Sequence, residues 1–252
     1  MVVESAGLTD SGCVRPENED RILVEPDAGL FVVCDGMGGP RRGDVAAETA
    51  IETIRHFILA TADRFDVTWP FGYKRDLSIA ANRLLTAILL ANHQVWRRAE
   101  QAPEHAGMGA TVAALLLEDN YAAAANVGDS RVYRLRAGCL RQLTVDDTII
   151  ADMLAHGIVS AEASRRHPMR NILTQAAGAK EKIEVHLWEE AIEPGDVFLI
   201  SSDGLHKPVP EEDMRASLST DVSAAARAGC LIEAARVAGG PDNVSAVVVA
   251  CE

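Results

Sequence analysis

Three aspartates that lie far apart in the chain each stand where an apolar run meets glycine or a polar turn. Asp35 follows the apolar run 30–34, Asp203 follows the run 197–200 and two serines, and Asp242 comes just before a third run. If these runs are neighbouring antiparallel strands, the three carboxylates meet at one end of a sheet. Carboxylate oxygens without an accompanying cluster of histidine or cysteine suit Mg²⁺ or Mn²⁺ rather than Zn²⁺. The pattern therefore predicts a metal site.

A hairpin turn is the alternative interpretation of each Asp-Gly pair, because Asp-Gly after a strand is a strong turn signal. For one pair taken singly, the turn is the favoured interpretation. Residues 35–39, however, read Asp-Gly-Met-Gly-Gly, which holds more glycine than a two-residue turn requires. Small residues let backbone carbonyls and ligands approach closely, so the combination of motifs favours a ligand site.

Two further motifs carry acidic residues. Arg15 precedes the stretch 18–20, Asn-Glu-Asp, and Asp129 lies in the stretch 128–131, Gly-Asp-Ser-Arg, between two strand-like runs. Taken alone, a solvated turn is the favoured interpretation of each. Together with the three aspartates above, they enlarge the set of candidate oxygen ligands.

The order and residues of these motifs resemble those of the protein phosphatase 2C family of metal-dependent protein phosphatases, in particular its compact bacterial members. The resemblance extends from Arg15 to Asp242. It depends on Arg15 with Asn18-Glu19-Asp20, on Asp35-Gly36-Met37-Gly38-Gly39, on Gly128-Asp129-Ser130-Arg131, on the stretch 167–174, on Ser202-Asp203-Gly204-Leu205 and on Asp242-Asn243. Several ordered motifs over most of a chain are highly specific.

The resemblance implies metal ligands at particular positions. Asp35 corresponds to the carboxylate that bridges two metal ions, Mn²⁺ or Mg²⁺, and Asp203 and Asp242 complete the protein ligands of one ion. Gly36 offers its carbonyl to the other ion, and Glu19 corresponds to the acidic position near it.

Three further roles follow from the resemblance. Asp20 corresponds to the neighbouring carboxylate that holds water at the site, and Arg15 to the arginine that binds the substrate phosphate. Asp129 and Asp203 correspond to a pair for a weaker third ion. Arg15, Asp20 and Asp35 are thus the predicted catalytic residues.

The chemistry of phosphate esters explains why such a set is needed. A phosphate monoester is a dianion at neutral pH and water is a poor nucleophile, so two close cations both screen charge and acidify water, which attacks in line. These esters are among the slowest to hydrolyse spontaneously, and preorganised cations with an arginine fork supply the required transition-state stabilisation.

Several positions depart from the family pattern. Met37 stands where many eukaryotic members have a histidine that acts as general acid, and a thioether cannot donate that proton. Pro40 and Asp147 replace histidines usual in bacterial relatives, and Ala110 interrupts a usual pair of hydroxyl residues. None of these is a core metal ligand of the family, so the resemblance implies a tuned rate rather than an inactive site.

Composition and charge exclude several classes of protein. The 252 residues, 48% hydrophobic and 24% charged, predict one globular domain over 1–252. A formal charge of -13 disfavours nucleic acid as a partner. Five scattered cysteines without a C-x-x-C pair indicate reduced thiols, and no apolar run approaches the roughly 18 residues of a membrane helix. We expect a cytoplasmic monomer without membrane contact.

The apolar runs 111–117, 121–127 and 131–135, separated by short turns, predict an antiparallel meander. Helical periodicity predicts helices over 44–60, 76–100 and 221–237, with Asp76 as the N-cap of the second, since their apolar residues follow one helical face. Because helices flank strands rather than alternate with them, we expect an α+β fold, an antiparallel β-sandwich with helices outside.

The stretch at about 144–182 is polar and helical and resembles the mobile flap of the family. Its basic cluster Arg165-Arg166-His167 has two interpretations, a reader of acidic residues near a phosphosite or an ordinary solvated face.

The predicted function is that of a bacterial serine/threonine phosphatase that hydrolyses phosphoserine and phosphothreonine in proteins and reverses a serine/threonine kinase. One alternative is a non-catalytic module that keeps the fold and binds partners. Another is a phosphatase that switches a single regulatory protein. Metal-dependent phosphate release separates the first alternative from the prediction, and substrate profiling separates the second.

Overall fold

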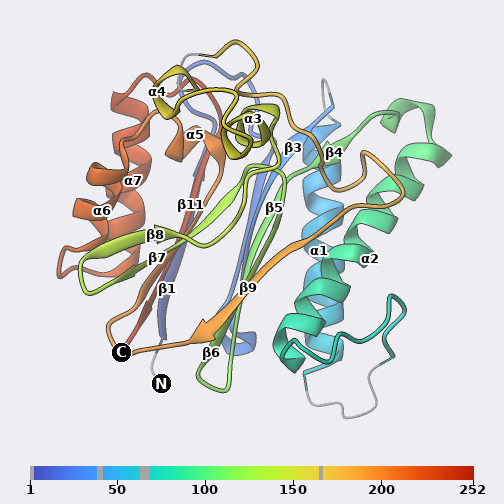
Figure 1. Ribbon diagram of the computed structural model, residues 1–252, viewed down its shortest axis with the longest axis horizontal. Helices are drawn as coiled ribbons and strands as arrows, with labels where there is room; N and C mark the ends of the chain where they lie inside the picture. The colour runs from blue at the N-terminus through green and yellow to red at the C-terminus, as the bar shows by residue number, and fades with distance from the viewer. Residues whose placement is uncertain (1–2, 39–41, 63–67, 165–166) are drawn as a thin grey trace.

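A computed structural model describes residues 3–38, 42–62, 68–164 and 167–252 (Figure 1). Pro40 and the pair Arg165-Arg166 lie outside these described residues. Two antiparallel sheets pack face to face, and helices cover the outer face of each, so the chain forms four layers.

One sheet has the strand order β1-β11-β10-β7-β8. Its strands are β1 (Val3–Asp10), β7 (Arg131–Arg136), β8 (Cys139–Gln142), β10 (Val197–Ser201) and β11 (Val244–Cys251). Its outer face is covered by α5 (Asp203–His206), α6 (Glu211–Leu218) and α7 (Ala224–Val237).

The other sheet has the order β2-β3-β5-β6-β9, with the short β4 paired to β3. Its strands are β2 (Asp20–Glu25), β3 (Leu30–Met37), β4 (Gly109–Ala110), β5 (Val112–Glu118), β6 (Tyr121–Val127) and β9 (His186–Ala191). The helices α1 (Gly43–Ala60) and α2 (Ile79–Gln101) cover it. Single turns of 3-10 helix follow β2 and α2, at Pro26–Ala28 and Pro103–His105.

The central strands contain unbroken apolar runs because both of their faces are buried. In β3, Leu30, Val32 and Cys34 pack under α1 and α2, whereas Phe31 and Val33 pack against the opposite sheet. Successive side chains of a strand point to opposite faces, so an unbroken apolar run is what a strand between a helix layer and a second sheet requires. The predicted α+β sandwich with outer helices is confirmed.

The predicted meander is wrong at one connection. β6 pairs with β5 and β9, whereas the next run, β7, pairs with β8 and β10 in the other sheet. Gly128, at φ +95°, begins the connection that carries the chain from one sheet to the other. This crossing brings Asp129 to the end of the sandwich between the two sheets.

Two of the predicted helices begin later than expected. The N-cap of α2 is Ser78, whose Oγ accepts a hydrogen bond from Ala81 N at 3.0 Å, and not Asp76. The N-cap of α7 is Ser223, which accepts from Ala226 N, so this helix starts at Ala224. In each case an apolar or acidic residue upstream fits the helical period, but the serine caps the first turn.

The segment 143–185, between β8 and β9, contains the predicted flap. It holds α3 (Ile149–Ala155) and the single turn α4 (Ala161–Ser164). Within the described ranges, no helix has both the length and the apolar character needed to cross a membrane.

Candidate active site

One cleft of about 820 Å³ lies at the end of the sandwich where β3 and β10 finish and β2 and β11 begin. Seven of the eight predicted site residues line it: Arg15, Glu19, Asp35, Gly36, Asp129, Asp203 and Asp242. The eighth, Asp20, is buried and does not line the cleft. The antiparallel pairing of the strands thus brings together residues that are up to 227 positions apart.

Asp35 is held inside β3 and not in a turn. Its amide N donates to Thr111 Oγ1 at 3.0 Å, and Thr111 N donates to the Asp35 carbonyl oxygen at 2.8 Å. Asp20 lies directly opposite Asp35 in the register of β2 and β3. The hairpin interpretation of this Asp-Gly pair is therefore wrong.

Gly36 is required by a close approach of two backbones. A Cβ atom built at Gly36 would lie 2.0 Å from the carbonyl oxygen of Gly43, at the start of α1. Gly43 is equally confined, since its Cβ would lie 2.9 Å from the carboxyl carbon of Glu19. These glycines bring α1, β3 and the Glu19 carboxylate into contact at the cleft.

Asp203 is also not in a hairpin, because it is the first residue of α5. A Cβ atom at Gly204 would lie 1.9 Å from the carbonyl oxygen of Asn243. Asn243 in turn accepts a hydrogen bond from Glu19 N at 2.9 Å and donates to the Glu17 carbonyl oxygen at 2.9 Å. Asn243 therefore fixes the segment that carries Arg15 and Glu19 beside Asp242. Sequence reasoning missed this role.

Asp20 is a buried carboxylate beneath the cleft. Ser202 Oγ and Ser245 Oγ each donate to its Oδ2 at 2.7 Å, and no described group bonds its buried Oδ1. Burial raises the pKa of Asp20 to about 7, against the opposite effect of the two serines, and Asp203 and Asp242 add to the rise. The two serines were not predicted, although each follows a buried strand residue in its motif.

The carboxyl group of Asp35 has a pKa well above its usual range. Burial is the largest cause, followed by the negative charges of Asp20, Asp203 and Asp129. The pKa of Glu19 is raised as well, chiefly by burial. Carboxylates that repel one another in a poorly hydrated place are stabilised by a cation.

The donor set fits a hard divalent cation. It consists of carboxylates and the Gly36 carbonyl, and the buried Asp203 Oδ1 has no hydrogen-bond partner among the described residues. As the side chains stand, no three acidic, histidine or cysteine groups in the described ranges surround one point closely enough to hold an ion. Three of the acids are instead paired with cations of the chain: Asp242 with Arg15, and Asp129 and Asp203 with Lys207.

Arg15 lies at the open rim of the cleft. Its side chain is 54% exposed, and Nη2 donates to Asp242 Oδ2 at 2.8 Å. This hydrogen bond is the main reason that the pKa of Arg15 is raised. An exposed guanidinium beside the acids can bind two oxygens of an incoming phosphate.

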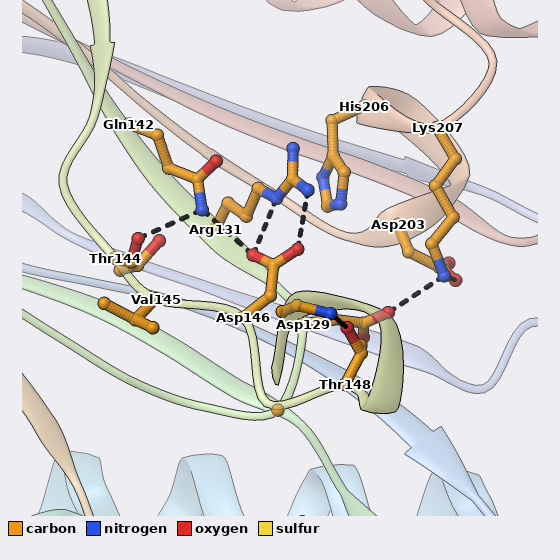
Figure 2. A network of polar contacts seen from close by, with 12 residues as sticks. Asp129, Arg131, Gln142, Thr144, Val145, Asp146, Thr148, Asp203, His206 and Lys207 are labelled. Atoms are coloured by element: carbon orange, nitrogen blue, oxygen red, sulfur yellow. Dashed lines mark hydrogen bonds and ion pairs between the residues drawn. The ribbon is translucent and has the colours of Figure 1, made fainter. Parts of the chain in front are cut away.

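Asp129 and Asp203 face the ammonium group of Lys207 (Figure 2). Burial and Asp203 raise the pKa of Asp129, and Lys207 opposes that rise. Burial alone would lower the pKa of Lys207, but the two acids outweigh it and the pKa is raised. Lys207 was missed by sequence reasoning, although its position four residues after Asp203 was a signal.

The flap segment contributes to the cleft wall and is anchored by Asp147. Asn171 and Leu173 line the cleft. Asp147 accepts from Gly128 N at 2.8 Å, and His186 Nε2 lies 2.8 Å from its other carboxylate oxygen. The residue that departs from the family histidine therefore ties the base of the flap segment to the sheet crossing and to β9.

Met37 lines the cleft, and no histidine belongs to the described lining. The described wall of the cleft thus offers no imidazole to protonate a leaving alkoxide.

Comparisons with known proteins agree with this geometry. A model of the family described as protein phosphatase 2C matches residues 16–232. The chain is 34% identical over 249 residues to the serine/threonine phosphatase stp of Listeria welshimeri, a match that covers 96% of this chain and 93% of that protein. It is 35% identical over 248 residues to the serine/threonine protein phosphatase PstP of Mycobacterium tuberculosis, covering 98% of this chain and 45% of PstP.

Solved structures give the same result. The crystal structure of PstP/Ppp from Mycobacterium tuberculosis superposes with a TM-score of 0.87 and 33% identity, and the match covers 100% of both chains. The catalytic domain of PstP in complex with two manganese ions matches with a TM-score of 0.84 and 32% identity, over 98% of this chain and 97% of that one.

The fold and the acidic cleft define the class of metal-dependent phosphatases. The chain belongs to the protein phosphatase 2C family, whose bacterial relatives named above are serine/threonine phosphatases.

Proposed function

We propose that this phosphatase hydrolyses phosphoserine and phosphothreonine in proteins at the acidic cleft, with two divalent cations, Mn²⁺ or Mg²⁺, held by its carboxylates. Asp35 would contact both ions, Asp203 and Asp242 one of them, and Glu19 and the Gly36 carbonyl the other. Such ions, when bound, lower the pKa of water and offset the charge of the phosphate. The single observation that carries the proposal is that seven residues from five separate motifs line one cleft.

The residues of the chain have separate tasks in this proposal. Arg15, at the exposed rim, binds and orients the phosphate dianion through its two terminal nitrogens. Asp20, beneath Asp35, has one carboxylate oxygen fixed by two serines and the other without a partner among the described residues, so it can hold water or a proton there. Met37 contributes apolar surface and no proton.

We propose that its substrates are phosphoproteins that a bacterial serine/threonine kinase modifies, and that it acts in the cytoplasm as a monomer. Five free cysteines, two of them buried, are compatible with a reducing compartment. Relatives that match over most of this chain carry the names serine/threonine phosphatase and serine/threonine protein phosphatase, which supports this substrate class.

The test is hydrolysis of a phosphothreonine peptide by protein stripped of metal, with and without added Mn²⁺. Asp203→Asn keeps the shape of the side chain and removes a ligand charge, so we expect activity to depend on Mn²⁺ and to disappear in this variant. Asp27→Asn is the matched control, because Asp27 is exposed and follows β2 at the end opposite to Asp20. No hydrolysis with any divalent cation would favour the non-catalytic module instead.

A further inference from the structure

The Asp129–Asp203 pair, which the resemblance assigns to a weaker third ion, already has a cation supplied by the chain. Lys207 Nζ donates to Asp129 Oδ2 at 2.9 Å and to Asp203 Oδ2 at 2.7 Å. We propose that the ammonium group of Lys207 takes the place of a third metal ion, so that the enzyme binds two ions and not three. This inference rests on the proposed function, since it presupposes that the other carboxylates bind metal.

The two acids need a positive charge between them. The side chain of Asp129 is 5% exposed and that of Asp203 is 16% exposed. Two carboxylates withdrawn from water repel each other, and one of them takes up a proton unless a cation lies close by. A lysine ammonium has three donors and no acceptor, and here it serves both acids at ordinary hydrogen-bond distances (Figure 2).

The backbone fixes Lys207 in this position. Lys207 N donates to the Asp203 carbonyl oxygen at 3.0 Å, which closes the turn of α5 and brings the side chains of residues i and i+4 to the same face. The preceding residue, His206, is buried, and its Nδ1 lies 3.0 Å from Ser201 Oγ. With His206 anchored in the core, the Lys207 side chain reaches Asp129 and Asp203 and stays 28% exposed.

A metal ion that enters between Asp129 and Asp203 has to displace this ammonium. The lysine is part of the chain, so its effective concentration at the pair is high and does not fall when the protein is diluted. A divalent ion carries more charge, but this pair offers it only two side chains, and the ion gives up water to bind. We therefore expect Lys207 to stay bonded to the Oδ2 atoms of the pair, while the other carboxylates and Asp203 Oδ1, which has no hydrogen-bond partner among the described residues, take up metal.

The experiment counts bound manganese directly. Metal-free protein is dialysed against free Mn²⁺ up to about 5 mM, above the range of weak carboxylate sites, and Mn²⁺ per chain is measured in the retained protein. Lys207→Met keeps the length of the side chain without its charge, Lys207→Arg keeps the charge, and Lys182→Met removes a charge from an exposed lysine of the flap segment. We expect two ions in the wild type, Lys207→Arg and Lys182→Met, and three in Lys207→Met.

The possible results separate the two proposals. Three ions in the wild type, or two in Lys207→Met, would overturn the role of Lys207 while peptide hydrolysis still supported the proposed function. No bound Mn²⁺ in any of the four proteins, together with no hydrolysis, would overturn the proposed function and this inference with it. Unfolding temperatures of the metal-free variants show that each chain is folded before the ions are counted.

Discussion

The two halves of the cleft stabilise their acidic groups differently. The inner half, made of Glu19, Asp35 and Asp242 with Asp20 buried beneath them, has an exposed arginine at its rim. The pKa values of Asp20 and Asp35 are raised. The lysine half consists of Asp129, Lys207 and Asp203, and Asp203 is also a ligand of the inner half in the proposed function. Its lysine is a cation bonded to both acids. In the lysine half, a cation of the chain therefore offsets the repulsion between carboxylates. In the inner half, a bound metal ion would offset it.

This difference predicts which carboxylates depend on a bound metal ion. A carboxylate whose pKa is raised by burial and by like charges gains most from a divalent cation. Removal of the metal ions should therefore destabilise the inner half far more than the lysine half.

The largest expected effect is on the inner half. Asp35→Asn removes a buried carboxylate whose pKa is raised by burial and by four neighbouring acids, and which would contact both ions, so we expect turnover of a phosphothreonine peptide to fall roughly a thousandfold or more. The measurement is the initial rate at saturating Mn²⁺, with Asp27→Asn as the control that keeps full activity. Wild-type turnover in Asp35→Asn would contradict the assignment of the inner half.

Gly36→Ala should disrupt the backbone frame of the inner half. The added methyl would lie 2.0 Å from the Gly43 carbonyl oxygen, so the strand or α1 must shift. We expect a loss of about 3 kcal/mol in the free energy of unfolding, or roughly 6–12 °C in Tm.

Gly229→Ala in α7 is the matched control, because the nearest atom outside its own helix backbone and chain neighbours would lie 4.0 Å from the new methyl. There we expect a gain of roughly 0.5–1 kcal/mol from helix propensity. Equal Tm values for the two variants would show that the close approach at Gly36 is unimportant.

The pH dependence of stability tests the raised pKa of Asp20. The folded chain holds this proton more tightly than the unfolded chain does, so the stabilisation is complete below about pH 4 and is lost as pH rises through about 7. Between pH 5.5 and 8 we expect the Tm of the metal-free wild type to fall by roughly 3–6 °C more than that of Asp20→Asn, which cannot ionise. Saturating Mn²⁺ should remove most of this difference. The same change of Tm with pH in both proteins would contradict the raised pKa of Asp20.

Arg15→Ala should have the smallest effect of this series. Its ion pair with Asp242 is exposed, so we expect Tm to change little. We expect KM for the peptide to rise roughly tenfold with a smaller change in kcat, because a charge-assisted contact to phosphate is lost. Arg236→Ala, another exposed arginine that pairs with Asp10, is the control and should leave KM unchanged. A larger loss in kcat than in KM would place Arg15 in the chemical step.

The inner half was predictable from the sequence because its residues follow or precede strands. Asp35, Asp203 and Asp242 are marked by apolar runs and glycines, and antiparallel pairing then collects them at one end of the sandwich. Gly36 and Gly204, however, serve close backbone contacts and not hairpin turns, which the sequence alone does not distinguish. Only the position of α1 against β3 reveals that.

The lysine half was harder to predict. Both faces of β7 carry buried apolar residues, Val132 on one and Tyr133 and Leu135 on the other, so its pattern does not show which sheet it joins, and the crossing that positions Asp129 was missed. The contact of Lys207 with Asp129 joins residues 78 positions apart and follows from that crossing. The contact of Asn243 with Glu19 joins residues 224 positions apart, and it was also missed.

The most direct test of the difference between the two halves is a crystal structure of the wild type grown with saturating Mn²⁺, with manganese located by its anomalous scattering. We predict manganese beside Asp35, Asp203, Asp242 and Glu19, none between Asp129 and Asp203, and Lys207 Nζ still bonded to both of these acids. Manganese between Asp129 and Asp203 with Lys207 displaced, or none beside Asp35, would contradict the account.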